Sequence, residues 1–221
     1  MSNKSYTVAE EVAHALTHGF GAVLSIVALV VMLLWSTAYG TVWHVVAVSI
    51  YGGSLILLYT ASTLYHSFPW PRVKSYFKQL DHAAIFLLIA GTYTPFMLIN
   101  LRGSWGWLFL AVAWSIALIG VAIELFAKNP PKWLSLTLYL GLGWMALVAI
   151  KPMFDNVEEA GLLLLLAGGL AYTLGVVFYV WHSLPYHHAI WHLFVLAGSA
   201  FHFFAIFYYV LPQPELLPTP G

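Results

Sequence analysis

Long apolar segments separated by short polar ones dominate this chain. Each is close to 20 residues, about the length that an α-helix needs to cross the hydrocarbon core of a bilayer. The pattern predicts seven spans, at His14–Trp35, Val42–Tyr65, His82–Leu98, Trp105–Ala127, Trp133–Ile150, Gly161–Trp181 and His188–Val210. A transmembrane β-barrel would need segments that alternate apolar and polar residues, and stretches such as GLLLLLAGGLAYTLGVVFYV do not alternate. We therefore predict an all-α integral membrane protein built as a seven-transmembrane helix bundle.

The spans leave little sequence for anything else. Residues 1–210 are predicted to form a single membrane domain, because the loops between spans are too short to hold a soluble domain. Residues 211–221 form a short proline-rich tail that we predict to be disordered. The first dozen residues carry one lysine and two glutamates, so they lack the basic region of a cleavable signal, and we expect the first span to be retained.

Composition excludes several classes of function. Hydrophobic residues make up 62% of the chain and charged residues only 7%, against roughly a quarter charged in soluble domains. So few charges cannot solvate the surface of a soluble enzyme. A net charge of zero without a basic cluster also excludes nucleic acid as a partner. The chain has no cysteine, which removes disulfides, thiolate metal ligands and a cysteine nucleophile.

Basic residues predict the orientation. The side of the membrane that holds the N-terminus has six: Lys4, Arg72, Lys74, Lys78, Lys128 and Lys132. The opposite side has two, Arg102 and Lys151. The positive-inside rule therefore predicts a cytoplasmic N-terminus and, with an odd number of spans, a C-terminus outside.

Most of the ten histidines gather at one predicted side. Those at span ends on the N-terminal side are His14, His18, His66, His82, His182, His187, His188 and His192. Only His44 lies near the outer edge, and only His202 lies well inside a span.

Two spacings within this cluster suggest metal chemistry. His188 and His192 are four residues apart, so both project from one helix face, about 6 Å apart along its axis. Ser62 and His66 have the same spacing on the second span. Three neutral imidazoles with one open position are typical of catalytic zinc. Asp81 would then hold a metal-bound water or orient a histidine.

The histidines also fit simpler roles. A histidine at a helix end is often only an interfacial residue with a hydrated tip. HALTH in the first span, with His14 and His18, is a second HxxxH motif, and spacing alone does not rank it below HAIWH. A metalloprotease HExxH motif is excluded, because Ala189 occupies the position of its glutamate.

The remaining polar residues fit structural roles as well. Ser62 could bond to a carbonyl of its own helix, and Asp81 could cap the N-terminus of the third helix. Glu124 could pair with Lys128 one turn later. Pro95 is expected to kink the third span.

Three segments resemble the bacterial hemolysin III family, which belongs to the progestin and adipoQ receptor (PAQR)-like seven-helix membrane proteins. They are GGSLILLYTASTLYH, Leu80–Phe96 and PYHHAIWHLFVLAGSAFHF. The resemblance covers about Val8 to Val210 and extends distantly to the alkaline ceramidases. Receptor members carry a long soluble region before the first helix, whereas about a dozen residues precede it here, so hormone-receptor function is not expected.

The resemblance implies a set of roles. His66, His188 and His192 would bind Zn²⁺, Asp81 would contact the water on the metal, and Ser62 would complete the polar shell. His14 and His18 are not ligands in that pattern, and they receive no role, like Glu124 and His202.

From these roles we predict a metal-dependent hydrolase of a lipid amide or ester in the bacterial inner membrane, with membrane lipids as partners. The alternatives are a non-catalytic regulator or sensor of membrane state with a structural zinc, and a channel or transporter. Neither the substrate nor an oligomeric state follows from the residues.

Overall fold

The computed structural model describes residues 6–127 and 131–213, and every regular element in these residues is a helix. The helices are α1 (Val8–Tyr39), α2 (Val42–Ser67), α3 (Pro71–Pro95), α4 (Ser104–Phe126), α5 (Lys132–Gly143), α6 (Ile150–Asn156), α7 (Glu159–Val180) and α8 (His187–Tyr209). A π-helical turn, Phe96–Asn100, continues α3, and a 3₁₀ segment, Trp144–Ala149, joins α5 to α6. Seven helical stretches in the described residues are long and apolar enough to cross a membrane, which confirms the predicted fold.

The boundaries of all seven spans differ from the predicted ones, and the third and fifth spans also change helical geometry along their length. The third helix begins at Pro71 rather than His82, because a helix can extend past its apolar part and proline suits the first helical position. Asp81 therefore lies inside α3, which excludes the alternative role considered for it, a cap of the helix N-terminus. The fifth span, predicted as a single helix, is divided into α5, the 3₁₀ segment and α6. Directly after Pro95, α3 changes to π-helical geometry.

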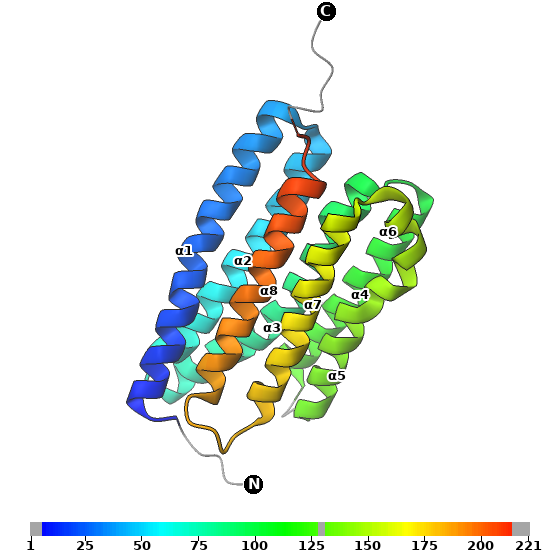
Figure 1. Ribbon diagram of the computed structural model, residues 1–221. Helices are drawn as coiled ribbons and strands as arrows, with labels where there is room; N and C mark the ends of the chain where they lie inside the picture. The colour runs from blue at the N-terminus through cyan, green and yellow to red at the C-terminus, as the bar shows by residue number, and fades with distance from the viewer. Residues whose placement is uncertain (1–5, 128–130, 214–221) are drawn as a thin grey trace, which may run out of the picture.

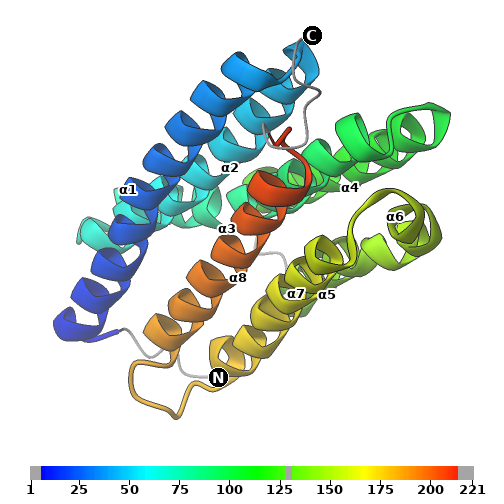
Figure 2. The ribbon, with the colours of Figure 1, turned by 45° about the horizontal axis from the view of Figure 1, so that its top comes forward.

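The packing order brings three helix ends together. Helix α1 packs on α2 and α8, α2 packs on α3, α3 on α4, and α7 on α8 (Figure 1). The start of α1, the end of α2 and the start of α8 lie at one end of the bundle, which we call the N-terminal end (Figures 1 and 2). Residues far apart in the sequence meet there.

Close helix contacts depend on small residues. A Cβ at Gly52 would lie 2.6 Å from Cδ1 of Leu29, so α1 and α2 approach each other only because this position lacks a side chain. A Cβ added at the neighbouring Gly53 would meet no atom of another helix within 4 Å. One glycine of the pair is therefore required for packing and the other is not.

The first residues after α8 pack against the bundle. Leu211 is 3% exposed, and Trp35 Nε1 donates a hydrogen bond to the carbonyl of Pro212 at 2.8 Å. The amide of Gln213 donates to the carbonyl of Phe207 at 3.0 Å. The rest of the predicted tail lies outside the described residues.

Reporter fusions should test the orientation. We expect alkaline phosphatase fused after Gly221 to be active, and phosphatase inserted between Arg72 and Lys78 to be inactive, because basic residues stay on the cytoplasmic side. Lys4 and Lys128, two of the residues behind this expectation, lie outside the described part of the chain. Equal activity at both positions would contradict both the orientation and the odd number of spans.

Candidate metal centre

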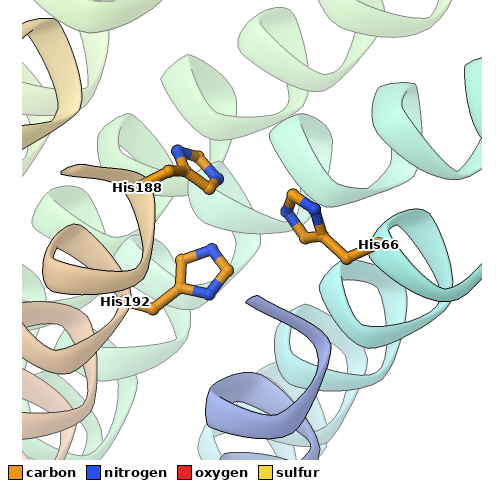
Figure 3. Close-up of side chains that lie close together, drawn as sticks. All are labelled: His66, His188 and His192. Carbon is orange, nitrogen blue, oxygen red and sulfur yellow. The ribbon is translucent and has the colours of Figure 1, made fainter. Parts of the chain in front are cut away.

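Three histidines meet at the N-terminal end of the bundle. His66 comes from the last turn of α2, and His188 and His192 come from the first two turns of α8. Each offers a ring nitrogen, and these atoms all lie within 4.8 Å of one another. Their residues are 4%, 8% and 1% exposed, and the rings turn toward one another (Figure 3). The structure therefore brings together the three residues selected as metal ligands from the sequence.

A carboxylate on α1 orients His66. The ring Nδ1 lies 2.7 Å from Oε2 of Glu11, which fits an N–H donated to the carboxylate. Lys74 Nζ donates to the other oxygen of Glu11 at 2.8 Å. With its proton on Nδ1, the imidazole of His66 keeps a lone pair on Nε2. A carboxylate–histidine pair of this kind is common behind protein metal ions.

The backbone of α1 orients the ring of His192, as Glu11 orients that of His66. Its Nδ1 lies 3.2 Å from the carbonyl oxygen of His14 and 3.0 Å from Oγ1 of Thr17. A carbonyl oxygen can only accept, so the contact with His14 places the proton on Nδ1 and leaves Nε2 as an acceptor. Contacts with α1 thus fix the tautomer of two of the three rings, those of His66 and His192.

The unused nitrogens fit a metal. His66 Nε2 and both ring nitrogens of His188 are buried without a hydrogen-bond partner in the described residues. A buried polar atom without a partner costs free energy unless something else binds it. Three imidazole nitrogens within 4.8 Å of one another are a suitable donor set for zinc.

The second HxxxH motif joins the same cluster. The His14 ring centroid lies 4.7 Å from that of His66, 4.9 Å from His188 and 5.5 Å from His192. The His18 ring stacks on His192 at 3.5 Å. Spacing could not rank the two motifs, and the structure shows that they are neighbours.

An aromatic residue covers the cluster from outside. The Tyr6 ring lies 4.7 Å from His14 and 5.5 Å from His188. Burial, followed by the nearby Tyr179 and Glu11, raises the pKa of Tyr6 well above its usual value, so its hydroxyl stays protonated.

The two other predicted site residues face a large apolar cavity. Ser62 and Asp81 line a cavity of about 580 Å³, together with His188 and His192. Ser62 is 0% exposed and lies close to the carboxylate of Asp81. Its Oγ makes no hydrogen bond of ordinary geometry with any described residue, so the bond to its own helix that we considered is absent.

Glu124 has partners different from the expected one. Its carboxylate accepts a hydrogen bond from Ser135 Oγ and lies 3.5 Å from Nδ1 of His82. Tyr139 Oη lies 3.4 Å from the same carboxylate. Lys128, the partner considered from spacing, lies outside the described residues.

The isolated histidines have local partners. His202 Nε2 lies 3.2 Å from the carbonyl of Leu165 and so links α8 to α7. His44 Nδ1 accepts from the backbone N–H of Thr41 at 3.0 Å, at the start of α2.

Sequence reasoning missed Glu11. The signal was present, because Glu11, His14 and His18 are spaced i, i+3 and i+7 and therefore share one helix face. The spacing does not say that this face meets α2 and α8.

Known proteins are similar to this chain over most of its length. The family described as "Haemolysin-III related" matches residues 6–203. "Hemolysin-3" of Bacillus cereus is 49% identical over 212 residues, which cover 96% of this chain and 97% of the relative. "Hemolysin-3 homolog" of Bacillus subtilis is 44% identical over 211 residues, 96% of this chain and 99% of the relative. The human "Monocyte to macrophage differentiation factor" is 34% identical over 217 residues, 94% and 87% of the two chains.

Proposed function

The chain belongs to the haemolysin-III-related family of multi-pass membrane proteins, and we propose that it is a zinc-dependent hydrolase of a lipid amide or ester in the bacterial inner membrane. One observation carries the proposal. Three buried imidazoles lie within reach of one ion, and two of them, His188 and His192, line a large apolar cavity together with the Asp81 carboxylate and the Ser62 hydroxyl.

His66, His188 and His192 would hold the ion, with Glu11 behind His66. A zinc ion bound by three imidazoles can lower the pKa of a bound water to about 7, which supplies a nucleophile at neutral pH. Asp81 would orient that water and take its proton on a carboxylate oxygen.

Ser62 would donate its hydroxyl proton to the carbonyl oxygen of the substrate. The Oγ is buried beside the carboxylate of Asp81 and makes no hydrogen bond of ordinary geometry with a described residue, so its proton can turn from Asp81 to a substrate oxygen. A donor held in place before the reaction costs no reorganisation when negative charge develops on that oxygen.

The cavity suits a lipid. Its lining runs from Asp81 and His188 to apolar residues such as Leu88, Leu165 and Val195, farther along the bundle. An acyl chain would lie on the apolar wall while its carbonyl group reaches the polar end. A small polar substrate would leave most of this surface without a partner.

One observation favours a second candidate function. The His14 ring is nearly as close to the three histidines as they are to one another. A fourth imidazole would close a zinc site, and closed sites are structural. The protein would then be a non-catalytic regulator of membrane state.

Assays on the purified protein should separate these functions. We expect about one tightly bound zinc per chain and slow release of fatty acid from a ceramide-type amide or a glycerolipid ester in detergent micelles. A chelator should abolish release, and added zinc should restore it, because the water is activated only on the metal. Metal content and mass spectrometry of the lipids provide the measurements. Stoichiometric zinc without turnover of any lipid in the panel would favour the regulator.

A further inference from the structure

A second group of possible ligands lies beside the three histidines. Glu11, His14 and His66 each offer an atom, and these atoms also lie within 4.8 Å of one another. Two imidazoles and one carboxylate form a known zinc donor set, different from the set of three histidines. His66 belongs to both groups.

The ring of His14 is buried without a hydrogen-bond partner among the described residues. It is 0% exposed, and neither of its ring nitrogens has a hydrogen-bond partner in the described residues. Its Nδ1 lies 3.9 Å from Oε2 of Glu11, too far for a hydrogen bond. A buried imidazole without partners is costly, and an ion between it and Glu11 would remove the cost.

The second group is open to the outside of the bundle. Glu11 and His66 line a separate cavity of about 520 Å³, with Ser67, Pro69 and Lys74, at the N-terminal end. The side chain of Glu11 is 19% exposed. Of these two cavities, His188 and His192 line only the large apolar one. A hydrated cation that enters from the N-terminal end therefore meets Glu11 first.

The ring of His66 lies between the two groups. Its Nδ1 faces Glu11. Its Nε2 has no hydrogen-bond partner among the described residues, and the ring of His188 lies nearby. The imidazole can hold an ion on either side, through one nitrogen at a time. Loss of the Nδ1 proton is the condition for binding on the Glu11 side.

We propose that Glu11, His14 and His66 form a second, weaker position for a divalent cation, through which the ion passes to the three histidines. The ion's destination rests on the proposed zinc site, but the position itself does not depend on any hydrolase activity.

Lys74 accounts for the lower affinity of this position. Its ammonium lies 2.8 Å from Oε1 of Glu11, where it neutralises the carboxylate in the absence of metal. An entering dication must displace or repel this charge, which lowers its affinity. Low affinity is what a transit position needs, because the ion has to leave it.

Equilibrium titration with Co²⁺ tests the position in a His188→Ala/His192→Ala variant, which lacks the three-histidine site but keeps all members of the second group. We expect this variant to bind one Co²⁺ per chain in the micromolar range in detergent. Adding His14→Ala or Glu11→Gln should weaken binding by about ten- to a hundredfold or more. Lys74→Met should instead strengthen it.

His18→Ala is the matched control in the same background. His18 is also a buried histidine with unpartnered nitrogens, but it is not a member of the group, and its loss should leave Co²⁺ affinity unchanged. The proposal would be overturned if the folded double variant bound no Co²⁺, or if neither His14→Ala nor Glu11→Gln changed its Co²⁺ affinity.

Loading kinetics of the otherwise unchanged protein give a second test, which also decides if the double variant does not fold. His14→Ala should slow zinc uptake by the metal-free protein but leave its equilibrium zinc content unchanged. If the loss of His14 weakens binding at the second position by about tenfold, we expect uptake to slow by about tenfold as well. His18→Ala should change neither. Unchanged uptake would overturn the proposal, as would loss of the tightly bound zinc, which would make His14 a fourth ligand. Neither experiment measures lipid turnover, so failure of the hydrolase proposal would be seen separately.

Discussion

Replacing any one of His66, His188 and His192 with alanine should remove most of the tightly bound zinc and lower the melting temperature in detergent. The three ligands would come from α2 and α8 and share one ion, so each ligand lost should weaken the whole site. An ion that binds only the folded state stabilises it by mass action, and that stabilisation disappears with the ion. Zinc content after desalting and thermal unfolding of the parent and the three variants provide the measurements.

Chelator treatment distinguishes this result from ordinary damage to packing. The chelator should lower the melting temperature of the parent and leave the variants almost unchanged. The His66→Ala/His192→Ala variant should be little less stable than either single variant, because residues that share one partner are not additive. The zinc site, and the hydrolase mechanism with it, would be excluded by two results together: additive losses of melting temperature in the variants, and a parent whose melting temperature does not change with chelator.

The sequence predicts the spans well and their ends poorly. Length and hydropathy are enough to recognise a helix that can cross a membrane, and the described residues contain seven, as predicted. The residues at which a helix begins and ends depend on backbone geometry and capping, and hydropathy does not report these. Residues 71–81 carry three basic residues and Asp81, so the apolar pattern does not include them, yet they belong to α3 and place Asp81 well inside it.

The break in the fifth span has the same kind of cause. Residues 133–150 are apolar enough for one helix, but Gly141 and Gly143 are poor helix formers. Pro152 follows within α6 and has no N–H to donate. The observed segment passes from α5 through a 3₁₀ helix to α6. Local composition predicts a weak helix here, but not the geometry that replaces it.

Within the candidate site, spacing predicts faces and not neighbours. The intervals Ser62–His66 and His188–His192 each place two side chains on one helix face, and these faces do meet. The partnership of His66 with Glu11 joins residues 55 positions apart and exists only because α1 packs on α2. No local pattern contains that information.

Asp81→Asn should separate catalysis from metal binding. Asparagine keeps the size of the side chain and most of its hydrogen bonding, but it cannot take a proton. Asp81 is 8% exposed and is not a member of the three-histidine group, so zinc should mostly remain. If the protein hydrolyses a lipid, turnover should fall by about 10²-fold or more, the usual effect of losing a general base.

Glu124→Gln is the matched control for this loss. Glu124 is a second buried carboxylate on the wall of the same cavity, but Ser135 and His82 already occupy its oxygens. Its replacement should therefore reduce turnover much less than Asp81→Asn, although stability should fall because these partners lose a charged acceptor. Turnover at substrate saturation, zinc content and melting temperature should be measured for both variants. Unchanged turnover in Asp81→Asn would remove Asp81 from the mechanism, and equal losses in the two variants would show that any buried carboxylate in the cavity has the same effect.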